Sequence, residues 1–283
     1  MDELYQRTLD FLNTDKYKED ILNFDVPDSL KPYLGTIPKR YQVTIAARSG
    51  CGKTTFALGL AVDYIMKHPD KKVLLFSLEI SKEDLMSKIL AYIGNINSRK
   101  IMTKTLSEEE LHYCNENIKE LRTSYPNFHI YDMEDVKQSV YTLAKILDEE
   151  NKESPVDLVF LDYIQLLAPK NKDHYMLVGN CNRVLHRLAV HYNFVLFSLS
   201  QIGRDADKRA DRRPMSADIS GSSQIEFDSE IILILYDDTH FTHTENNPVI
   251  RKLSVECVKN RNSSFGQAYV LMNFSTGRLY NAE

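Results

Sequence analysis

Ala47-Arg48-Ser49-Gly50-Cys51-Gly52-Lys53-Thr54 is the stretch of this chain that decides its fold. An apolar run at residues 42–46 precedes it and predicts a strand, and residues 55–62 follow it with apolar side chains at helical spacing. A strand, a tight loop, Gly-Lys-Thr and a helix together form the context of a phosphate-binding P-loop. The alternative is an ordinary strand-to-helix turn, which the motifs further along the chain disfavour.

The chemistry of such a loop assigns roles to its residues. Successive backbone N–H groups and a helix N-terminus point at one spot and favour an anion there. We expect Lys53 to reach the terminal phosphates of a nucleotide and the Thr54 hydroxyl to ligate Mg²⁺. We also expect the helix-terminus amides to lower the pKa of the Cys51 thiol and make it reactive. The residues expected around the phosphates are Ser49, Gly50, Cys51, Gly52, Lys53, Thr54 and Thr55.

The composition is that of a chain able to fold into one large or two small domains. It has 283 residues, of which 43% are hydrophobic. The 35 basic and 40 acidic residues give a net charge of −5, so any nucleic-acid binding must use a local patch. The four cysteines lack zinc-ligand spacing, which favours free thiols in a reducing compartment. Because there is neither a membrane-length apolar run nor a signal peptide, we expect a soluble, cytoplasmic protein without membrane partners.

Two carboxylates stand where predicted strands end. Glu79 follows a strand at residues 72–78, and Asp162 closes a near-continuously apolar strand at residues 156–161. Ligands bind at the carboxyl ends of strands in open α/β sheets. Glu79 is therefore a candidate general base for an attacking water, or else a solvated residue or helix cap. Asp162 is the candidate Mg²⁺ partner, although without a P-loop it would simply end a strand.

The rest of the chain alternates between predicted helices and strands. Residues 81–150 are mainly helical around a strand at 128–131, and a helix at about 176–191 leads to a strand at 194–200. That last strand ends in Gln201, whose side-chain amide can donate to a γ-phosphate. The pattern predicts an α/β fold with a central, mostly parallel, twisted sheet flanked by helices.

The two ends of the chain have their own patterns. Residues 2–12 are a short amphipathic helix candidate, which either folds back on its own domain or docks on a neighbouring subunit. A loop through residues 27–38 then leads into the P-loop strand. Three further strands are predicted at residues 231–236, 253–258 and 267–273, and we expect antiparallel strands near the C-terminus.

Basic residues gather in two places. Lys259 and Arg261 lie one residue apart in a turn between two predicted strands, so they point the same way if the strand pattern continues. The second place is the segment 204–213, and a loop of this length without regular structure is usually functional. The alternative is a solvated loop whose cations pair with its three aspartates. The basic residues of the segment are Arg204, Lys208, Arg209, Arg212 and Arg213.

With these pieces in order, the chain resembles the RecA-like motor domain of DnaB-type replicative helicases. The resemblance covers roughly residue 34 to the C-terminus, and Ala47 in place of the first P-loop glycine is the family's own habit. The segments that carry it are Ala47-Arg48 with Gly52-Lys53-Thr54, Phe76-Ser77-Leu78-Glu79-Ile80-Ser81, Leu161-Asp162-Tyr163-Ile164-Gln165-Leu166, Leu199-Ser200-Gln201, Arg212-Arg213-Pro214-Met215 with Asp218, Ile225-Glu226-Phe227-Asp228, and Lys259-Asn260-Arg261-Asn262 with Gly266.

The resemblance implies a ring, usually a hexamer, that binds ATP at each subunit interface and moves along single-stranded DNA. It implies that residues 26–283 are the motor and that residues 1–25 are at most the family's linker helix, which docks on the adjacent subunit. The primase-binding domain that usually precedes the motor is expected to be absent, as in a minimal phage- or plasmid-encoded form. A helicase loader or a primase is a candidate partner. The catalytic set carried over is Lys53, Glu79, Gln201, Lys259 and Arg261, the last two acting in the neighbour's site.

One segment departs from the family. Relatives commonly carry an Arg-Glu-x-Gly stretch that touches the DNA backbone, and this chain has Ser220 in place of the arginine and Gly221 in place of the glutamate. We still expect Ser220, Gly221, Ser222 and Ser223 to contact DNA. Either part of the DNA binding has moved to the basic segment 204–213, or DNA is held loosely and the protein needs a loader. The alternative function is a nucleotide-dependent assembly or loading ATPase that binds DNA or protein without unwinding. A RecA-like strand-exchange ATPase fits the motifs less well.

Overall fold

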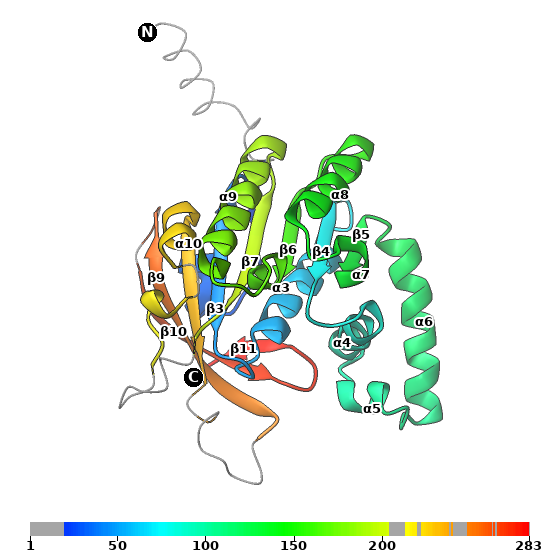
Figure 1. The fold of residues 1–283 in the computed structure, drawn as a ribbon. Coiled ribbons are helices and arrows are strands. Elements are labelled where there is room, and N and C mark those ends of the chain that lie inside the picture. The colour runs from blue at the N-terminus through cyan, green and yellow to red at the C-terminus, as the bar shows by residue number, and fades with distance from the viewer. Residues whose placement is uncertain are drawn as a thin grey trace, which may run out of the picture.

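In the part of the chain that the structure describes, the computed structural model has a nine-stranded sheet and a separate two-stranded sheet (Figure 1). The strand order of the large sheet is β11-β10-β9-β8-β3-β7-β6-β4-β5. The expected α/β class, with a mostly parallel sheet and antiparallel strands near the C-terminus, is confirmed. The described residues are 20–203, 213–219, 222–237, 239, 248–261, 263 and 265–282.

Six neighbouring strands of the large sheet run parallel, and three at one edge run antiparallel. The long apolar runs of the parallel strands are buried on both faces, as the sequence predicts. The parallel strands are β3 (Gln42–Ala47), β4 (Val73–Ser77), β5 (Phe128–Asp132), β6 (Leu158–Asp162), β7 (Val195–Gln201) and β8 (Ile231–Tyr236). The antiparallel strands are β9 (Ile250–Asn260), β10 (Gly266–Asn273) and β11 (Leu279–Asn281).

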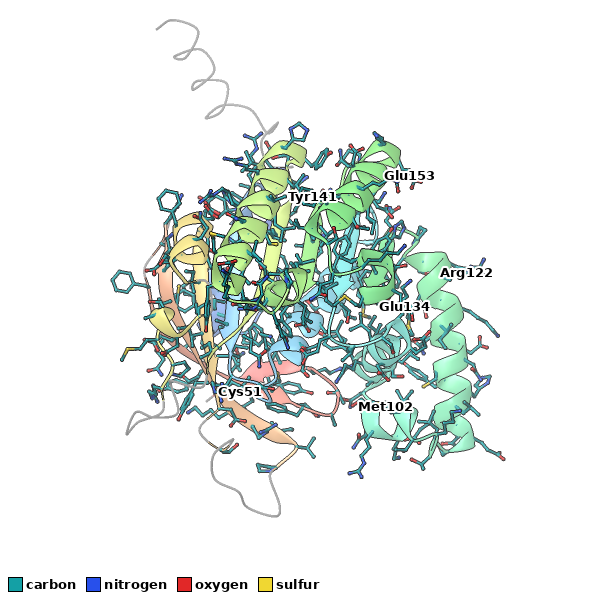
Figure 2. All side chains as sticks on the ribbon, in the orientation of Figure 1. Cys51, Met102, Arg122, Glu134, Tyr141 and Glu153 are labelled. Atoms are coloured by element: carbon teal, nitrogen blue, oxygen red, sulfur yellow. The ribbon has the colours of Figure 1, made fainter. Side chains whose placement is uncertain are left out.

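Helices cover both faces of this sheet, which therefore has two cores. Because successive strand residues point to opposite faces, Ile45 of β3 lies in one core and Ala46 in the other. Helix α3 (Lys53–Lys67) packs on the first face, and α8 (Val140–Glu153) and α9 (His174–Tyr192) lie side by side on the second (Figure 1). Side chains fill the space between the sheet and these helices (Figure 2). The remaining helices are α4 (Lys82–Gly94), α5 (Ser98–Met102), α6 (Glu108–Ser124), α7 (Met133–Val136) and α10 (Ser222–Asp228).

The segment before the P-loop strand corrects one expectation. Instead of an irregular loop, the two short strands β1 (Ile21–Asn23) and β2 (Thr36–Pro38) form an antiparallel pair, with α2 (Lys31–Leu34) between them. Alternating apolar residues bury one side of this hairpin: Leu22, Phe24 and Ile37 are all in the first core. The expected helix at residues 2–12 lies outside the described residues.

Two helix starts that the sequence indicates are present. Ser107 caps α6 in a reciprocal arrangement with Glu110, in which each side chain accepts from the other's backbone N–H. Ser81 caps α4 by accepting from Asp84 N at 3.2 Å. Among the described residues, no helix is both long enough and apolar enough to cross a membrane.

Candidate active site

Four parallel strands bring the predicted site residues to one side of the sheet, the edge formed by the carboxyl ends of the strands. Ala47 at the end of β3 lies beside Gln201 at the end of β7, and Ser77 at the end of β4 lies beside Asp162 at the end of β6. The loop before α3 starts at this edge, and Glu79 follows β4 by two residues. The structure therefore gathers the P-loop, Glu79, Asp162 and Gln201 at the carboxyl ends of the strands, where ligands bind in such sheets.

The loop before α3 requires glycine at two positions. Gly50 and Gly52 have φ angles of 83° and 82°, a region that side chains rarely adopt. At Gly52 the space is closed as well, because a Cβ atom would lie 2.4 Å from the Cε of Met272. Gly52 caps α3, and its carbonyl accepts from Phe56 N at 2.8 Å. The loop thus leads directly into a helix N-terminus, the arrangement that binds phosphate.

Lys53, Thr54 and Asp162 form the polar centre of the site. The Thr54 hydroxyl donates to Asp162 Oδ2 at 2.5 Å, and Lys53 Nζ lies 3.7 Å from Asp162 Oδ1. Lys53 also lies over the ring of Tyr163, 4.3 Å from its centroid. Burial lowers the pKa of Lys53, although the charges of Asp162 and Glu79 act to raise it. The Lys53 ammonium group is therefore largely desolvated and lies beside a carboxylate.

This centre fits a magnesium ion. Asp162 Oδ1 is buried and has no hydrogen-bond partner, which is costly unless something else binds it. Carboxylate and hydroxyl oxygens are the ligands that Mg²⁺ prefers, and the ion usually takes only one or two from protein and the rest from phosphate and water. The described residues contain no cluster of three or more His, Cys, Asp or Glu that could hold a metal by themselves.

Glu79 and Gln201 flank this centre. The Glu79 side chain is exposed on the whole, but its carboxylate is partly desolvated. This desolvation and the nearby charge of Asp162 raise the pKa of Glu79, while the charge of Lys53 acts to lower it. Gln201 N donates to Gln165 Oε1 at 3.1 Å, and Gln165 Nε2 donates to Ser200 Oγ at 2.7 Å. Gln165 was not assigned a role from the sequence. The signal for Gln165 in the sequence was its place in the family segment 161–166, three residues after Asp162.

The expectation of a lowered pKa and a reactive thiol at Cys51 was wrong. The thiol is fully buried, and this burial raises its pKa to about 11. The neighbouring charge of Asp237 adds to the rise, while a backbone hydrogen bond at Asp237 and the charges of Arg48 and Arg251 oppose it. The side chain belongs to the first hydrophobic core, so we expect an unreactive thiol. All four cysteines are free and buried, which agrees with the expectation of unpaired thiols.

Lys259 and Arg261 lie near the amino ends of the parallel strands, whereas the P-loop lies at their carboxyl ends. Lys259 pairs with Ile232 near the start of β8, and Ile231 pairs with Val43 near the start of β3. Strand β3 separates this position from the P-loop by roughly 16 Å at 3.3 Å per residue. The two cations therefore cannot reach the phosphate loop of their own chain.

Most residues expected to contact DNA are outside the described part of the chain. Arg213 is described and lies over the ring of Tyr236, 5.4 Å from its centroid, and Ser223 is described and exposed. The expectations that lie outside the described residues or side chains concern Arg204, Lys208, Arg209, Arg212, Ser220, Gly221 and Ser222.

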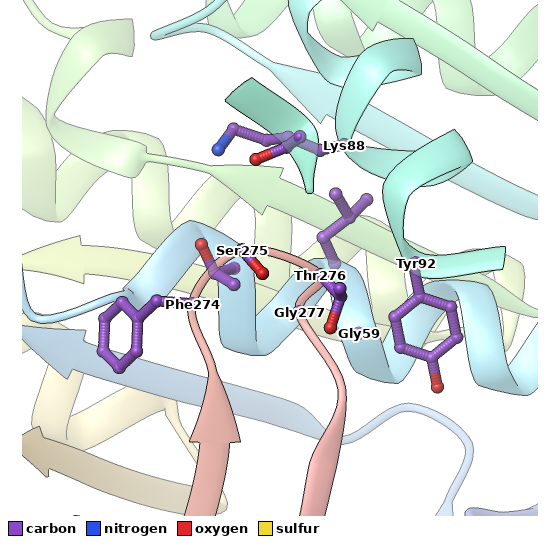
Figure 3. A pocket seen from close by; sticks show the side chains of 10 residues that line it. Gly59, Lys88, Tyr92, Phe274, Ser275, Thr276 and Gly277 are labelled. Carbon is purple, nitrogen blue, oxygen red and sulfur yellow. The ribbon is translucent and has the colours of Figure 1, made fainter. Parts of the chain in front are cut away.

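A small pocket opens next to the P-loop helix (Figure 3). Its walls include Thr55 and Gly59 of α3, Tyr92 of α4, and the turn at residues 274–277. The turn is fastened to this region, because Arg278 donates to the carbonyls of the last turn of α4 at 2.9 and 3.0 Å. No sequence pattern indicates this pocket, because residues far apart in the chain form it.

The fold and the site together define a RecA-like P-loop ATPase domain. The chain belongs to the DnaB-like helicase C-terminal domain family, whose model matches residues 30–281. The resemblance seen in the sequence is thereby confirmed.

Individual relatives agree with this assignment. The chain is 31% identical over 242 residues to a replicative DNA helicase DnaB from Buchnera aphidicola subsp. Schizaphis graminum, covering 84% of this chain and 51% of the relative. It is 30% identical over 194 residues to a probable plasmid replicative DNA helicase from Chlamydia muridarum, covering 68% and 42%. This chain spans about half the length of the curated relatives it matches.

Two solved structures have the same fold. A solved ATPase domain matches with a TM-score of 0.79 at 28% identity, covering 100% of this chain and 98% of that chain. A solved DnaB-like replicative helicase, described with its primase interactions, matches with the same TM-score and identity. That second match covers 99% of this chain and 68% of the solved chain.

Proposed function

We propose that this chain is the ATP-hydrolysing motor of a ring-forming replicative DNA helicase that acts on single-stranded DNA. The observation that carries the proposal is the Lys53–Thr54–Asp162 centre behind a P-loop, in which the buried Asp162 Oδ1 has no hydrogen-bond partner and lies 3.7 Å from Lys53 Nζ. ATP and Mg²⁺ are the proposed cofactors. The P-loop leads into the N-terminus of α3, and a helix N-terminus favours an anion such as the phosphates of ATP.

The chain's own residues divide the work of hydrolysis. The P-loop amides and Lys53 bind the phosphates, while Thr54 and Asp162 hold the magnesium ion. When bound, that ion neutralises charge on the phosphate oxygens. Glu79 orients a water molecule and accepts its proton, a role that its raised pKa favours by bringing it nearer to neutral pH. Gln201, at the neighbouring strand end, contacts the γ-phosphate.

The pocket beside Thr55 is the proposed place of the adenosine part of the nucleotide. It lies next to the residue that follows Thr54 and is lined by the aromatic rings of Tyr92 and Phe274. These two rings suit a base, which has flat apolar faces, and hydroxyl-bearing residues such as Thr55 and Ser98 line the pocket beside them.

Lys259 and Arg261 are proposed to act in the site of a neighbouring subunit. Their position near the amino ends of the parallel strands supports this, because they are too distant to contact phosphates bound by their own P-loop. Cations placed on phosphate oxygens stabilise the charge that develops during transfer. A head-to-tail ring, proposed to be a hexamer, supplies such a pair at every interface.

The proposed DNA contacts are the segments 204–213 and 220–223. A local patch is required, because the whole chain carries a net charge of −5. A loader or a primase is a proposed partner, supported by a solved relative described with its primase interactions.

The direct test is strand displacement on a forked DNA substrate, with DNA-stimulated ATP hydrolysis measured in parallel. We expect the protein to displace the strand only when ATP and Mg²⁺ are present, and Lys53→Ala to do neither reaction. ATP hydrolysis that DNA stimulates without any strand displacement would favour the assembly or loading ATPase instead. Strand displacement by Lys53→Ala would contradict the proposal.

A further inference from the structure

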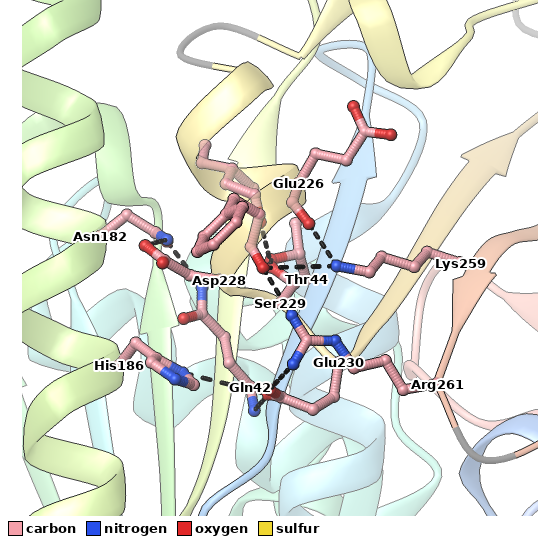
Figure 4. Close-up of polar contacts among 12 residues, drawn as sticks. Gln42, Thr44, Asn182, His186, Glu226, Asp228, Ser229, Glu230, Lys259 and Arg261 are labelled. Carbon is pink, nitrogen blue, oxygen red and sulfur yellow. Dashed lines mark hydrogen bonds and ion pairs between the residues drawn. The ribbon is translucent and has the colours of Figure 1, made fainter.

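The carbonyl end of α10 holds both cations at the end of β9 (Figure 4). Lys259 Nζ donates to the carbonyl of Glu226 and lies 3.4 Å from the carbonyl oxygen of Phe227. Arg261 Nη2 donates to the same Phe227 carbonyl at 2.7 Å. The last carbonyls of a helix have no partner within it and carry the negative end of its dipole. They therefore form a natural site for these two cations.

Glu230 adds a further contact to Arg261. Its Oε1 lies 3.3 Å from Arg261 Nη1, and its backbone carbonyl accepts from Arg261 N at 3.0 Å. Its second carboxylate oxygen, Oε2, accepts from Gln42 N at 2.8 Å, which fixes the carboxylate to the start of β3. The side chain of Glu230 is 9% exposed and that of Arg261 is 48% exposed. A buried, fixed carboxylate thus holds a cation whose side chain reaches toward solvent.

A hydrogen-bonded network behind Glu230 fixes its position. Asp228 Oδ2 accepts from Asn182 Nδ2 at 3.0 Å, and Asn182 Oδ1 accepts from Gln42 Nε2 at 2.6 Å. The hydroxyls of Ser229 and Thr44 lie 2.7 Å apart. These bonds tie the segment after α10 to α9 and to β3, and every one of these side chains is buried. Strand β3 therefore leads into the P-loop at its carboxyl end and fixes Glu230, which contacts Arg261, at its amino end.

We propose that Glu230 is a positioning residue for Arg261, which it orients toward the phosphates bound by a neighbouring subunit. The inference rests on the proposed trans role of Arg261. A guanidinium group has five N–H donors in a rigid plane, so contacts at two of its terminal nitrogens fix the direction of the others. Orientation matters because a displacement of about 1 Å can cost on the order of 10²-fold in rate.

The test is Glu230→Gln, which keeps the size of the side chain and an acceptor for Gln42 N but removes the charge. We expect kcat for ATP hydrolysis to fall roughly 10- to 100-fold while KM for ATP changes less than about twofold. Binding of ADP, ring assembly and the melting temperature should stay close to wild type. Glu230→Asp, which restores the charge, should recover part of the rate.

The matched control is Glu226→Gln, which removes the same charge four residues earlier in the chain, within α10. The side chain of Glu226 is exposed, and Lys259 contacts its backbone carbonyl, which the substitution keeps. We expect nearly wild-type turnover. If Glu230→Gln lowered kcat no more than this control, or lost ring assembly or ADP binding along with activity, the positioning role would be overturned.

Mixed rings assign the defect to the correct interface. Glu230→Gln subunits mixed with Lys53→Ala subunits should regain activity, because some interfaces then join an intact P-loop to an intact Arg261. Glu230→Gln mixed with Arg261→Ala should regain none, because both defects affect the same contribution. Recovery in the second mixture would overturn the inference. Full activity of Arg261→Ala alone would instead remove the proposed trans role on which the inference rests.

Discussion

Two carboxylates at the strand ends have different environments, and this difference supports the separate roles proposed for them. Asp162 is buried against Lys53 and Thr54, whereas Glu79 is exposed at the edge of the same centre. Burial and the charge of Asp162 raise the pKa of Glu79. A pair of acids whose surroundings differ in this way is typical of sites that bind a cation with one and move a proton with the other.

Glu79→Gln should retain ATP binding and lose most of its hydrolysis. The expected loss in kcat is about 10²–10⁴-fold, because the amide cannot accept a proton from water. The matched control is Glu83→Gln, the same change at an exposed position in the first turn of α4. Since the base works only when deprotonated and its pKa is raised, the acid limb of the wild-type pH–rate profile should lie above 4.5, the ordinary value. Normal turnover in Glu79→Gln would place the base elsewhere.

Cys51 should resist alkylation in the folded protein and destabilise it at high pH. Its pKa rises from 9.0 to about 11 on burial, so the folded state favours the neutral thiol. The stabilising contribution is complete below pH 9 and is lost as pH rises toward 11, by up to about 1.4 kcal/mol per pH unit. Denaturant unfolding at about pH 8 and pH 10, on either side of the ordinary thiol pKa, should show a larger loss for wild type than for Cys51→Ala. Rapid modification of native Cys51 by iodoacetamide at the lower pH would contradict this expectation.

At the scale of elements, the sequence predicted whatever depends on local pattern. The P-loop, the strand ends at Glu79 and Asp162, and the capping box at Ser107 all follow from residues close together in the chain. The β1–β2 hairpin was missed because its strands have three residues each and its prolines and glycine are typical of a loop. The expected pKa of Cys51 was wrong because distant residues enclose the thiol, and Glu230 was missed because only strand register brings it to Arg261.

Helix α3 and the turn at residues 274–277 are packed too closely for a side chain at Gly59. A Cβ atom there would lie 2.6 Å from the carbonyl oxygen of Gly277. Gly→Ala inside a helix normally stabilises it by about 1 kcal/mol. Here we expect Gly59→Ala to lower the free energy of unfolding by roughly 1–3 kcal/mol, because the backbone must shift. The measurement is chemical denaturation.

The control for this prediction is Gly203→Ala, where the nearest atom would be the Asp218 carbonyl oxygen at 3.6 Å, an ordinary contact. It should be close to neutral. A Gly59→Ala protein that is more stable than wild type would show that the turn does not rest on α3 as the structure has it.

At the scale of the whole molecule, the proposed function places the two halves of an ATP site at opposite ends of the parallel strands. Lys53, Thr54 and Asp162 lie where the parallel strands end, and Lys259 and Arg261 lie where β3 and β8 begin. No single chain can bring these groups together, since a whole strand separates them. The proposed head-to-tail ring would join them at each interface and would make hydrolysis a property of the assembly.

The most direct measurement is ATP hydrolysis by mixtures of Lys53→Ala and Arg261→Ala subunits that have been allowed to exchange. Each variant alone should be nearly inactive, because an arginine supplied in trans contributes on the order of 10³–10⁵ in rate. In an equal mixture, about one quarter of the interfaces join an intact P-loop to an intact Arg261, so up to about that fraction of the wild-type rate should return. No recovery in mixtures shown to contain both subunits would contradict the shared site.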